Sequence, residues 1–153
     1  MAFLGNINIV GSGLTAQQLR LDIISENITN LNTTRTVDGE GPYRRKMVVF
    51  EAEGGRDSFR MAMARAVNNS NRGTERSAGV RVAEIVEDES PFPLSYDPTH
   101  PDANEDGYLE MPNITLVKEI TDAMAATQAY SANVTAFNTL KSVIARGLDL
   151  GAR

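Results

Sequence analysis

The densest group of chemically capable side chains lies in the segment DANEDG at residues 102–107. Its acidic and amide residues at alternate positions, followed by Gly107, reproduce the opening of an EF-hand calcium loop, with Leu109 at the usual apolar eighth position. The twelfth position, which should be a bidentate Glu, is Asn113, and Pro112 stands just before it. We therefore expect a turn capped by carboxylates and amides rather than a calcium site.

The other side chains that could perform catalysis are isolated. His100 is the only histidine, so no multi-histidine metal site can form, and the chain has no cysteine to act as a nucleophile or thiolate ligand. Gly11 and Gly13 lack the third glycine and the preceding strand of a phosphate-binding loop. The acidic run of Glu84 and residues 87–89 is typical of a solvated strand end. We expect a protein that is not an enzyme and has no cofactor or metal.

Charge and hydropathy exclude further classes. The net charge is −5, and the most basic stretch, residues 56–76, is interrupted by Asp57 and Glu75, so we expect no nucleic-acid partner. No apolar run approaches the roughly 18 residues of a membrane span, so we expect no membrane insertion. The N-terminus does not resemble a cleavable signal peptide. The chain is therefore expected to be cytosolic, or to be exported by a route that leaves its N-terminus uncut.

Two long helices and a small β-containing region are the elements that must position these residues. The first helix is predicted from about Ile7 or Leu14 to Leu31, and the last from Pro112 or Asn113 to about Leu148. We expect an α+β fold in which these helices pair as in a coiled coil around a small irregular middle module. The expected division is residues 1–35, 36–111 and 112–153.

The middle module is predicted to contain short strands. Residues 43–51, 79–88 and 108–111 have strand-like patterns, and Phe59, Met63 and Val67 have the spacing of a short helix. Residues 90–106 hold four prolines, so we predict no regular element there.

Both predicted helices carry a seam of residues at alternating spacings of four and three. In the first helix the seam is Phe3, Ile7, Val10, Leu14, Gln17, Leu21, Ile24, Ile28 and Leu31. In the last helix it is Ile120, Ala123, Thr127, Tyr130, Val134, Phe137, Lys141, Ile144 and Leu148. This 3.5-residue repeat lets one helix lay a stripe against another, and the polar Gln17 and Lys141 are typical of positions that fix register.

Further apolar residues lie off these seams. They are Leu19, Ile23, Leu116, Met124, Leu140 and Val143. They leave a second apolar surface, which predicts assembly with neighbouring molecules. An ordinary helical hairpin in a monomer is the alternative.

Several stretches of the chain resemble sequence motifs of a known protein family. SGLTAQQLRLD at 12–22 and NITNLNT at 27–33 are similar to the N-terminal motif of flagellar rod, hook and other axial proteins. Three stretches narrow the resemblance to the bacterial flagellar basal-body rod proteins of the proximal-rod FlgC type: GPYRRK at 41–46, YDPTHPDAN at 96–104 with Gly107 and Tyr108, and AYSANVTAFN at 129–138. The ending LDLG at 148–151 also fits this family. The resemblance covers nearly the whole chain except about residues 51–78. One departure is SEN at 25–27, where the family more usually has small residues and paired asparagines.

The resemblance implies a structural subunit of the periplasmic rod. Such subunits are exported by the flagellar type III apparatus without cleavage and polymerise through terminal helices that fold on assembly. Their partners are copies of themselves, other rod subunits, basal-body ring proteins and the export apparatus. The implied assembly interface consists of Leu14, Leu21, Ile24, Ile28, Leu31, Tyr130, Val134, Phe137 and Ile144. The alternatives are a distal-rod or hook subunit, or a calcium-binding helical hairpin.

Overall fold

The computed structural model describes residues 2–36, 41–53, 63 and 79–151. Its elements are α1 (Ala2–Thr29), β1 (Lys46–Glu53), β2 (Gly79–Glu87), β3 (Leu94–Tyr96), β4 (Tyr108–Glu110) and α3 (Leu116–Gly151). A long helix at each end and a small middle module with two antiparallel sheets confirm the predicted α+β class. The predicted short helix near Met63 falls almost entirely outside the described residues.

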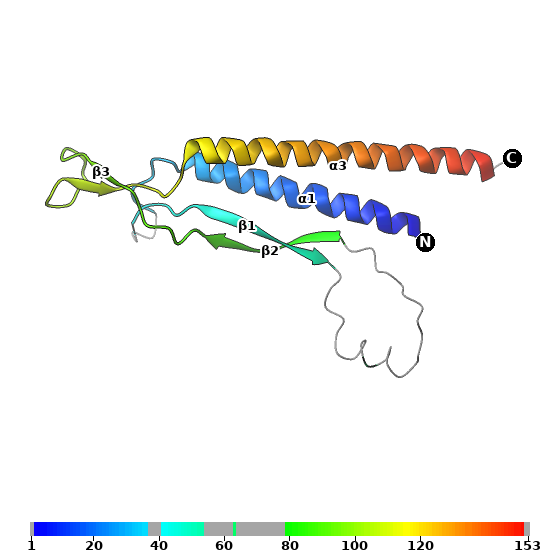
Figure 1. Ribbon diagram of the computed structural model, residues 1–153, viewed down its shortest axis with the longest axis horizontal. Coiled ribbons are helices and arrows are strands. Elements are labelled where there is room, and N and C mark those ends of the chain that lie inside the picture. The colour runs from blue at the N-terminus through cyan, green and yellow to red at the C-terminus, as the bar shows by residue number, and fades with distance from the viewer. Residues whose placement is uncertain (1, 37–40, 54–62, 64–78, 152–153) are drawn as a thin grey trace.

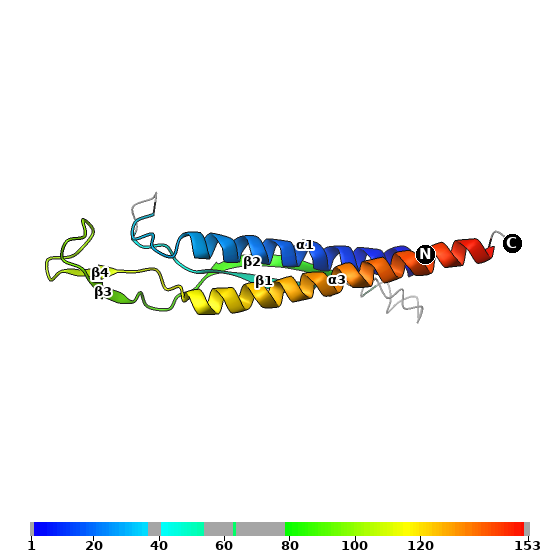
Figure 2. The same ribbon diagram turned by 90° about the horizontal axis from the view of Figure 1, so that it is seen from above.

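The two helices run antiparallel, so both termini lie at the same end of an elongated molecule (Figure 1). α1 lies between α3 and the β1–β2 ribbon, and it contacts both of them (Figures 1 and 2). α3 has 36 residues and α1 has 28, and the surplus extends past the start of α1. At a rise of about 1.5 Å per residue, this overhang is on the order of 12 Å long.

α1 begins earlier than the prediction of Ile7 or Leu14, which was wrong. Gly11 and Gly13 lower the helix propensity of this segment, but tertiary contacts outweigh that cost. A Cβ atom added to Gly13 would lie 3.0 Å from Nδ2 of Asn133 on α3, so glycine permits the close approach of the two helices. The hydroxyl of Ser12 accepts a hydrogen bond of 3.0 Å from the backbone N–H of Val80 on β2.

The last helix was also misjudged at its start, which is Leu116 rather than Pro112 or Asn113. Asn113 instead has its side chain engaged outside the helix. Its Oδ1 accepts a hydrogen bond from the backbone N–H of Arg45 at 2.8 Å, and its Nδ2 donates to the carbonyl of Asp88 at 2.9 Å. These bonds join three segments that are distant in the sequence just before α3 begins.

The ribbon is an antiparallel pair in which Lys46 lies opposite Glu87 and Glu53 opposite Gly79. The register shifts between Val49 and Phe50, as at a β-bulge, which increases the local twist of the ribbon. One face of the ribbon covers α1, and its other face is largely exposed.

β3 and β4 form a separate hairpin beyond the end of α1 and the start of α3 (Figure 1). The prediction that residues 90–106 contain no regular element was wrong, because β3 lies between Pro93 and Pro98. Only three residues pair, and the prolines flank them, so no ladder bond has to come from a proline. Gly107 has φ +77° in the turn before β4, a conformation that favours glycine.

Candidate assembly site

The predicted interface residues in and just after α1 differ in burial. Ile24 is buried at 6% exposure, whereas Leu14, Leu21, Ile28 and Leu31, which follows α1, are partly buried. The other buried residues among those described in α1 are Ala16, Ile23 and Asn27, which lie off the predicted seam. The Oε1 atom of Gln17, a seam residue, is buried without a hydrogen-bond partner among the described residues. The N-terminal seam is therefore only partly covered by contacts inside one molecule.

α3 buries a line of residues adjacent to the predicted seam. The line consists of Glu119, Ala126 and Asn133 at intervals of seven, and Glu119 and Ala126 have no exposed surface. Together with Ala16 on α1, these small and polar residues let the two helices approach closely. Tyr130 and Ile144, at the edge of this contact, are partly buried.

Six of the eight exposed large apolar residues that the structure describes on α3 lie in a stripe beside the buried line, and Leu116 and Val143 are the other two. We define the α3 stripe as Val117, Ile120, Met124, Val134, Phe137 and Leu148. Val134 and Phe137, both predicted interface residues, are each 36% exposed, and Met124 is 69% exposed. Scattered exposed apolar residues are normal on a monomer, whereas several that gather on one side of a helix are typical of an interaction surface.

Asn27, near the end of α1, is the centre of a buried polar network that joins α1, β1 and α3. Its side chain is 1% exposed and makes four hydrogen bonds. Nδ2 donates to the carbonyl of Lys46 at 2.9 Å and to Oε2 of Glu119 at 3.1 Å. Oδ1 accepts from the hydroxyl of Tyr43 at 3.0 Å and from the N–H of Lys46 at 2.9 Å. All the bonding capacity of this amide is used.

Arg45 and Glu119 form the charged half of the network. Nε of Arg45 lies 2.6 Å from Oε1 of Glu119, and the two side chains are 7% and 0% exposed. The guanidinium also lies 3.2 Å from the carboxylate of Asp122 and 3.9 Å from that of Asp88. Arg20 of α1 approaches Asp122 from the other side, at 3.5 Å. Removing one partner from such a buried pair leaves an uncompensated charge, so the pair fixes how the elements fit together.

Burial has a clear effect on the tyrosine of this network. Loss of water, and then the negative charge of Glu26, raise the pKa of the Tyr43 hydroxyl far above its ordinary value of 10. The hydroxyl therefore remains protonated and available as a donor to Asn27. At the edge of the network, hydrogen bonds from the Ser90 hydroxyl and backbone lower the pKa of the Asp88 carboxyl.

The departure at residues 25–27 fits this arrangement. Glu26 forms an ion pair of 2.7 Å with the Nζ of Lys46, so its extra charge is compensated within the chain. Asn27 is the hub of the network. Sequence reasoning did not identify Asn27, Arg45 and Glu119 as a connected group. The sequence did contain a signal for this group. Helical spacing places two acids, Glu119 and Asp122, in line with two small residues, Ala126 and Ala129.

The acidic segment that resembles a calcium loop is engaged in turn and loop contacts. Oδ2 of Asp102 accepts from the Thr34 hydroxyl at 2.9 Å, and Oδ1 lies 2.5 Å from Arg35. Oδ1 of Asn104 accepts from the backbone N–H of Tyr108 at 2.8 Å. Nowhere in the described ranges do three His, Cys, Asp or Glu side chains gather as a metal site would require.

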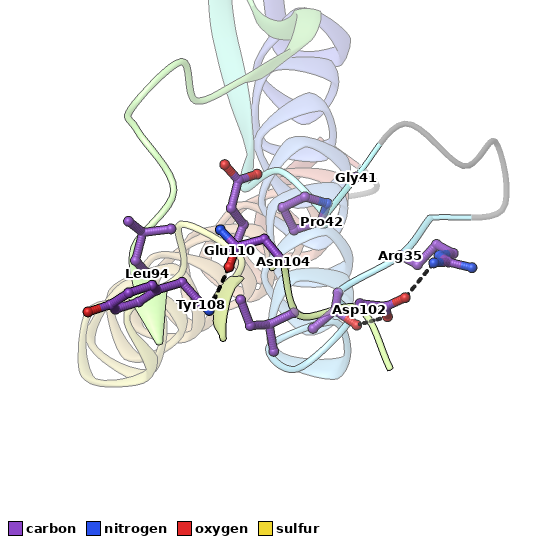
Figure 3. A pocket seen from close by; sticks show the side chains of 10 residues that line it. Arg35, Gly41, Pro42, Leu94, Asp102, Asn104, Tyr108 and Glu110 are labelled. Carbon is purple, nitrogen blue, oxygen red and sulfur yellow. Dashed lines mark hydrogen bonds and ion pairs between the residues drawn. The ribbon is translucent and has the colours of Figure 1, made fainter. Parts of the chain in front are cut away.

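A pocket lies between this hairpin and the loop that follows α1 (Figure 3). It has a volume of about 330 Å³, and we call it the tip pocket. Its apolar lining includes Pro42, Leu94, Tyr108 and Leu109, and Asp102 and Glu110 are its acidic lining residues. Leu109 is buried, whereas Leu94 is 65% exposed.

Among the helices that the structure describes, none has a stretch apolar enough to span a membrane.

Comparison with known proteins gives matches at both ends and over the full length. Residues 7–35 match the family model "Flagella basal body rod protein", and residues 105–150 match "Flagellar basal body rod FlgEFG protein C-terminal". The chain is 42% identical to the flagellar basal-body rod protein FlgC of Bacillus subtilis, over 95% of this chain and 96% of that protein. It is 41% identical to FlgC of Borreliella burgdorferi, over 98% of each chain, and 37% identical to FlgC of Escherichia coli, over 99% of each.

Proposed function

The chain belongs to the FlgC family of flagellar basal-body rod proteins, and we propose that it polymerises through its terminal helices into the periplasmic drive shaft. The family consists of structural subunits, so its role is mechanical rather than catalytic. The observation that carries the proposal is the α3 stripe. It is a set of large apolar side chains that remain 36% to 73% exposed in the single chain.

Polymerisation would cover the α3 stripe with surfaces of neighbouring subunits. Fully burying one Leu, Ile, Val, Phe or Met side chain contributes about 1.5–3 kcal/mol, and the stripe contains six such side chains in partly exposed positions. Even partial burial of the stripe in an assembly provides a substantial driving force. The predicted interface residues of the first helix contribute less, because they are already buried or partly buried in the single chain and have less surface left to cover.

Torque transmission requires that a subunit not shear internally when its neighbours push on it. The buried network that joins Asn27, Arg45 and Glu119 resists sliding of α1 against α3, since any shift separates charged groups in a water-poor environment. Force applied to the α3 stripe would thus reach α1 and the ribbon. This supports a role in the shaft and not only in its assembly.

The partners in this proposal are copies of the chain, other rod subunits, the surrounding basal-body rings and the flagellar export apparatus. Its location is the periplasmic part of the basal body, reached without cleavage of a signal peptide. The predicted division into residues 1–35, 36–111 and 112–153 then has a functional meaning. The two end segments assemble, and the middle module faces other neighbours.

The test is Val134→Asp in a motile strain. Val134 is 36% exposed, so a carboxylate there can reach water in the free subunit but would be buried against a neighbour in the rod. We expect loss of motility and absence of rods from isolated basal bodies, with normal subunit expression and far-UV circular dichroism.

Thr139→Asp is the matched control. Thr139 is exposed on the same helix, five residues further and about 140° around it, away from the stripe. We expect this strain to swim. Normal rods in the Val134→Asp strain would contradict the proposal, and so would equal loss of motility in both strains.

A further inference from the structure

The two ends of the long axis differ in chemistry. One end carries the β3–β4 hairpin and the tip pocket, and the opposite end carries the overhang of α3 (Figures 1 and 2). Neither end is covered by the rest of the described chain. Surfaces at opposite ends of an elongated subunit that fit each other would join subunits end to end.

The tip pocket has both buried and exposed apolar residues in its lining. Leu109 is 6% exposed, whereas Leu94 and Tyr108, labelled in Figure 3, are 65% and 45% exposed. Tyr96 lies beside Tyr108, with ring centroids 5.3 Å apart, and is itself 65% exposed. A small hairpin that keeps three large apolar side chains in water is not explained by its own folding.

The hairpin is also strongly acidic. Residues 97–110 contain five carboxylates and no Lys or Arg. Asp102 is paired with Arg35. Among the described residues, no ion pair compensates Glu105, Asp106 or Glu110. The tip therefore presents exposed carboxylates next to a pocket whose lining is partly apolar.

The last turns of α3, in and just before the overhang, have the complementary character. Leu148 is 69% exposed, and Lys141 lies seven residues earlier on the same side of the helix, about 10 Å away along the axis. Arg146 adds a second positive charge, and Asp149 is the only acid in residues 138–151. No ion pair among the described residues engages either base.

We propose that the tip pocket receives the overhanging end of the C-terminal helix of an axial neighbour. This helix would place an exposed leucine in the pocket and a lysine two turns earlier against the acidic rim, as α3 does with Leu148 and Lys141. The helix docks by its side, so the acidic rim meets Lys141 and not the electronegative carbonyls at the helix end. The inference rests on the proposed function, because it specifies one contact within the assembled rod.

The chemistry of the two surfaces favours a helix of this family over another protein. The C-terminal part of this chain, residues 105–150, matches a family model named for other rod and hook proteins, so helices of this kind belong to several axial subunits. A pocket of about 330 Å³ has room for one or two large apolar side chains of such a helix.

The experiment is site-specific photo-cross-linking in assembled basal bodies, with p-benzoylphenylalanine in place of Leu94. A second strain carries the same cross-linker in place of Ala83, an exposed residue of β2 away from the pocket. Adducts are isolated from purified basal bodies and mapped by mass spectrometry of their peptides. We expect the Leu94 adduct to map to the last turns of the C-terminal helix of an axial subunit, and the Ala83 adduct to map elsewhere.

Charge variants give a second readout. Glu110→Lys should lower the yield of the Leu94 adduct about fivefold, as expected for loss of one exposed ion pair, and Glu89→Lys should leave it unchanged. Leu94 adducts to ring proteins or to another segment would overturn the inference, as would the absence of adducts or an equal effect of both charge variants. If basal bodies contain the subunit but the adducts map elsewhere, only this inference fails. If basal bodies lack the unmodified subunit, the proposed function fails.

Discussion

Replacement of Glu119 by alanine tests whether a buried ion pair holds the two helices and the ribbon together. The change removes the 2.6 Å contact to Nε of Arg45 and the 3.1 Å hydrogen bond from Nδ2 of Asn27. Arg45 would remain buried with Asp122 at 3.2 Å and Asp88 at 3.9 Å. It would therefore be only partly compensated.

The expected loss of stability follows from this geometry. Removing one partner of a buried pair costs about 3–5 kcal/mol of unfolding free energy, and the contact to Asp122 places Glu119→Ala near the lower value. For a chain of 153 residues, each kcal/mol lowers the melting temperature by roughly 2–4 °C. We therefore expect a decrease of roughly 6–12 °C.

The assay is urea and thermal unfolding of the purified chain, followed by far-UV circular dichroism and by tyrosine fluorescence. Coincident transitions by both probes would justify a two-state analysis. Glu89→Ala is the matched control, because Glu89 is an exposed acid outside the network. It should change the unfolding free energy by less than about 0.5 kcal/mol.

A double variant separates the charge from the packing. Glu119→Leu with Arg45→Met removes both charges and keeps most of the volume, so its stability should exceed that of either single variant. The coupling energy from this cycle measures the pair directly. The reasoning is refuted if Glu119→Ala costs less than about 1 kcal/mol, or if the double variant is no more stable than the single variants.

Two other predictions concern the helix contact and the buried tyrosine. Gly13→Leu should destabilise the chain by more than about 1 kcal/mol, because the leucine side chain would meet Asn133 where the two helices approach. Gly11→Ala should stabilise the chain by up to about 1 kcal/mol, because nothing lies within 4 Å of the added Cβ atom. A urea midpoint that is higher for Gly13→Leu than for Gly11→Ala would contradict this packing. The pKa of Tyr43 is higher in the folded chain than in the unfolded chain, so above about pH 10 the unfolded state binds fewer protons and stability falls as pH rises. Tyr43→Phe should make the decrease in unfolding free energy between pH 10 and 11 shallower. If the unfolding free energy falls equally steeply with pH in both proteins, burial does not raise the pKa of Tyr43.

The end helices could be foreseen because helical periodicity and the positions of glycine and proline are local properties. Spacings of four and three placed Ile24 and Ile144 on a packing side, and Leu109 appeared as an apolar residue in a turn-rich acidic segment. The errors were at boundaries. α1 continues without a break through Gly11 and Gly13 because contacts made by Ser12 and Gly13 outweigh the poor helix propensity of this segment, and propensity alone does not include such contacts.

The side of α3 that is buried could not be deduced from apolarity. The face against α1 is lined by Glu119, Ala126 and Asn133. The pattern of apolar residues instead predicts a packed face that contains Val134 and Phe137. Glu119 can be fully buried because Arg45 and Asn27, which lie 74 and 92 residues away in the chain, pair with its carboxylate. Pairing between such distant groups depends on how the chain folds back on itself. Local sequence therefore specified the helices, and long-range contacts selected which face each helix buries and which it leaves exposed.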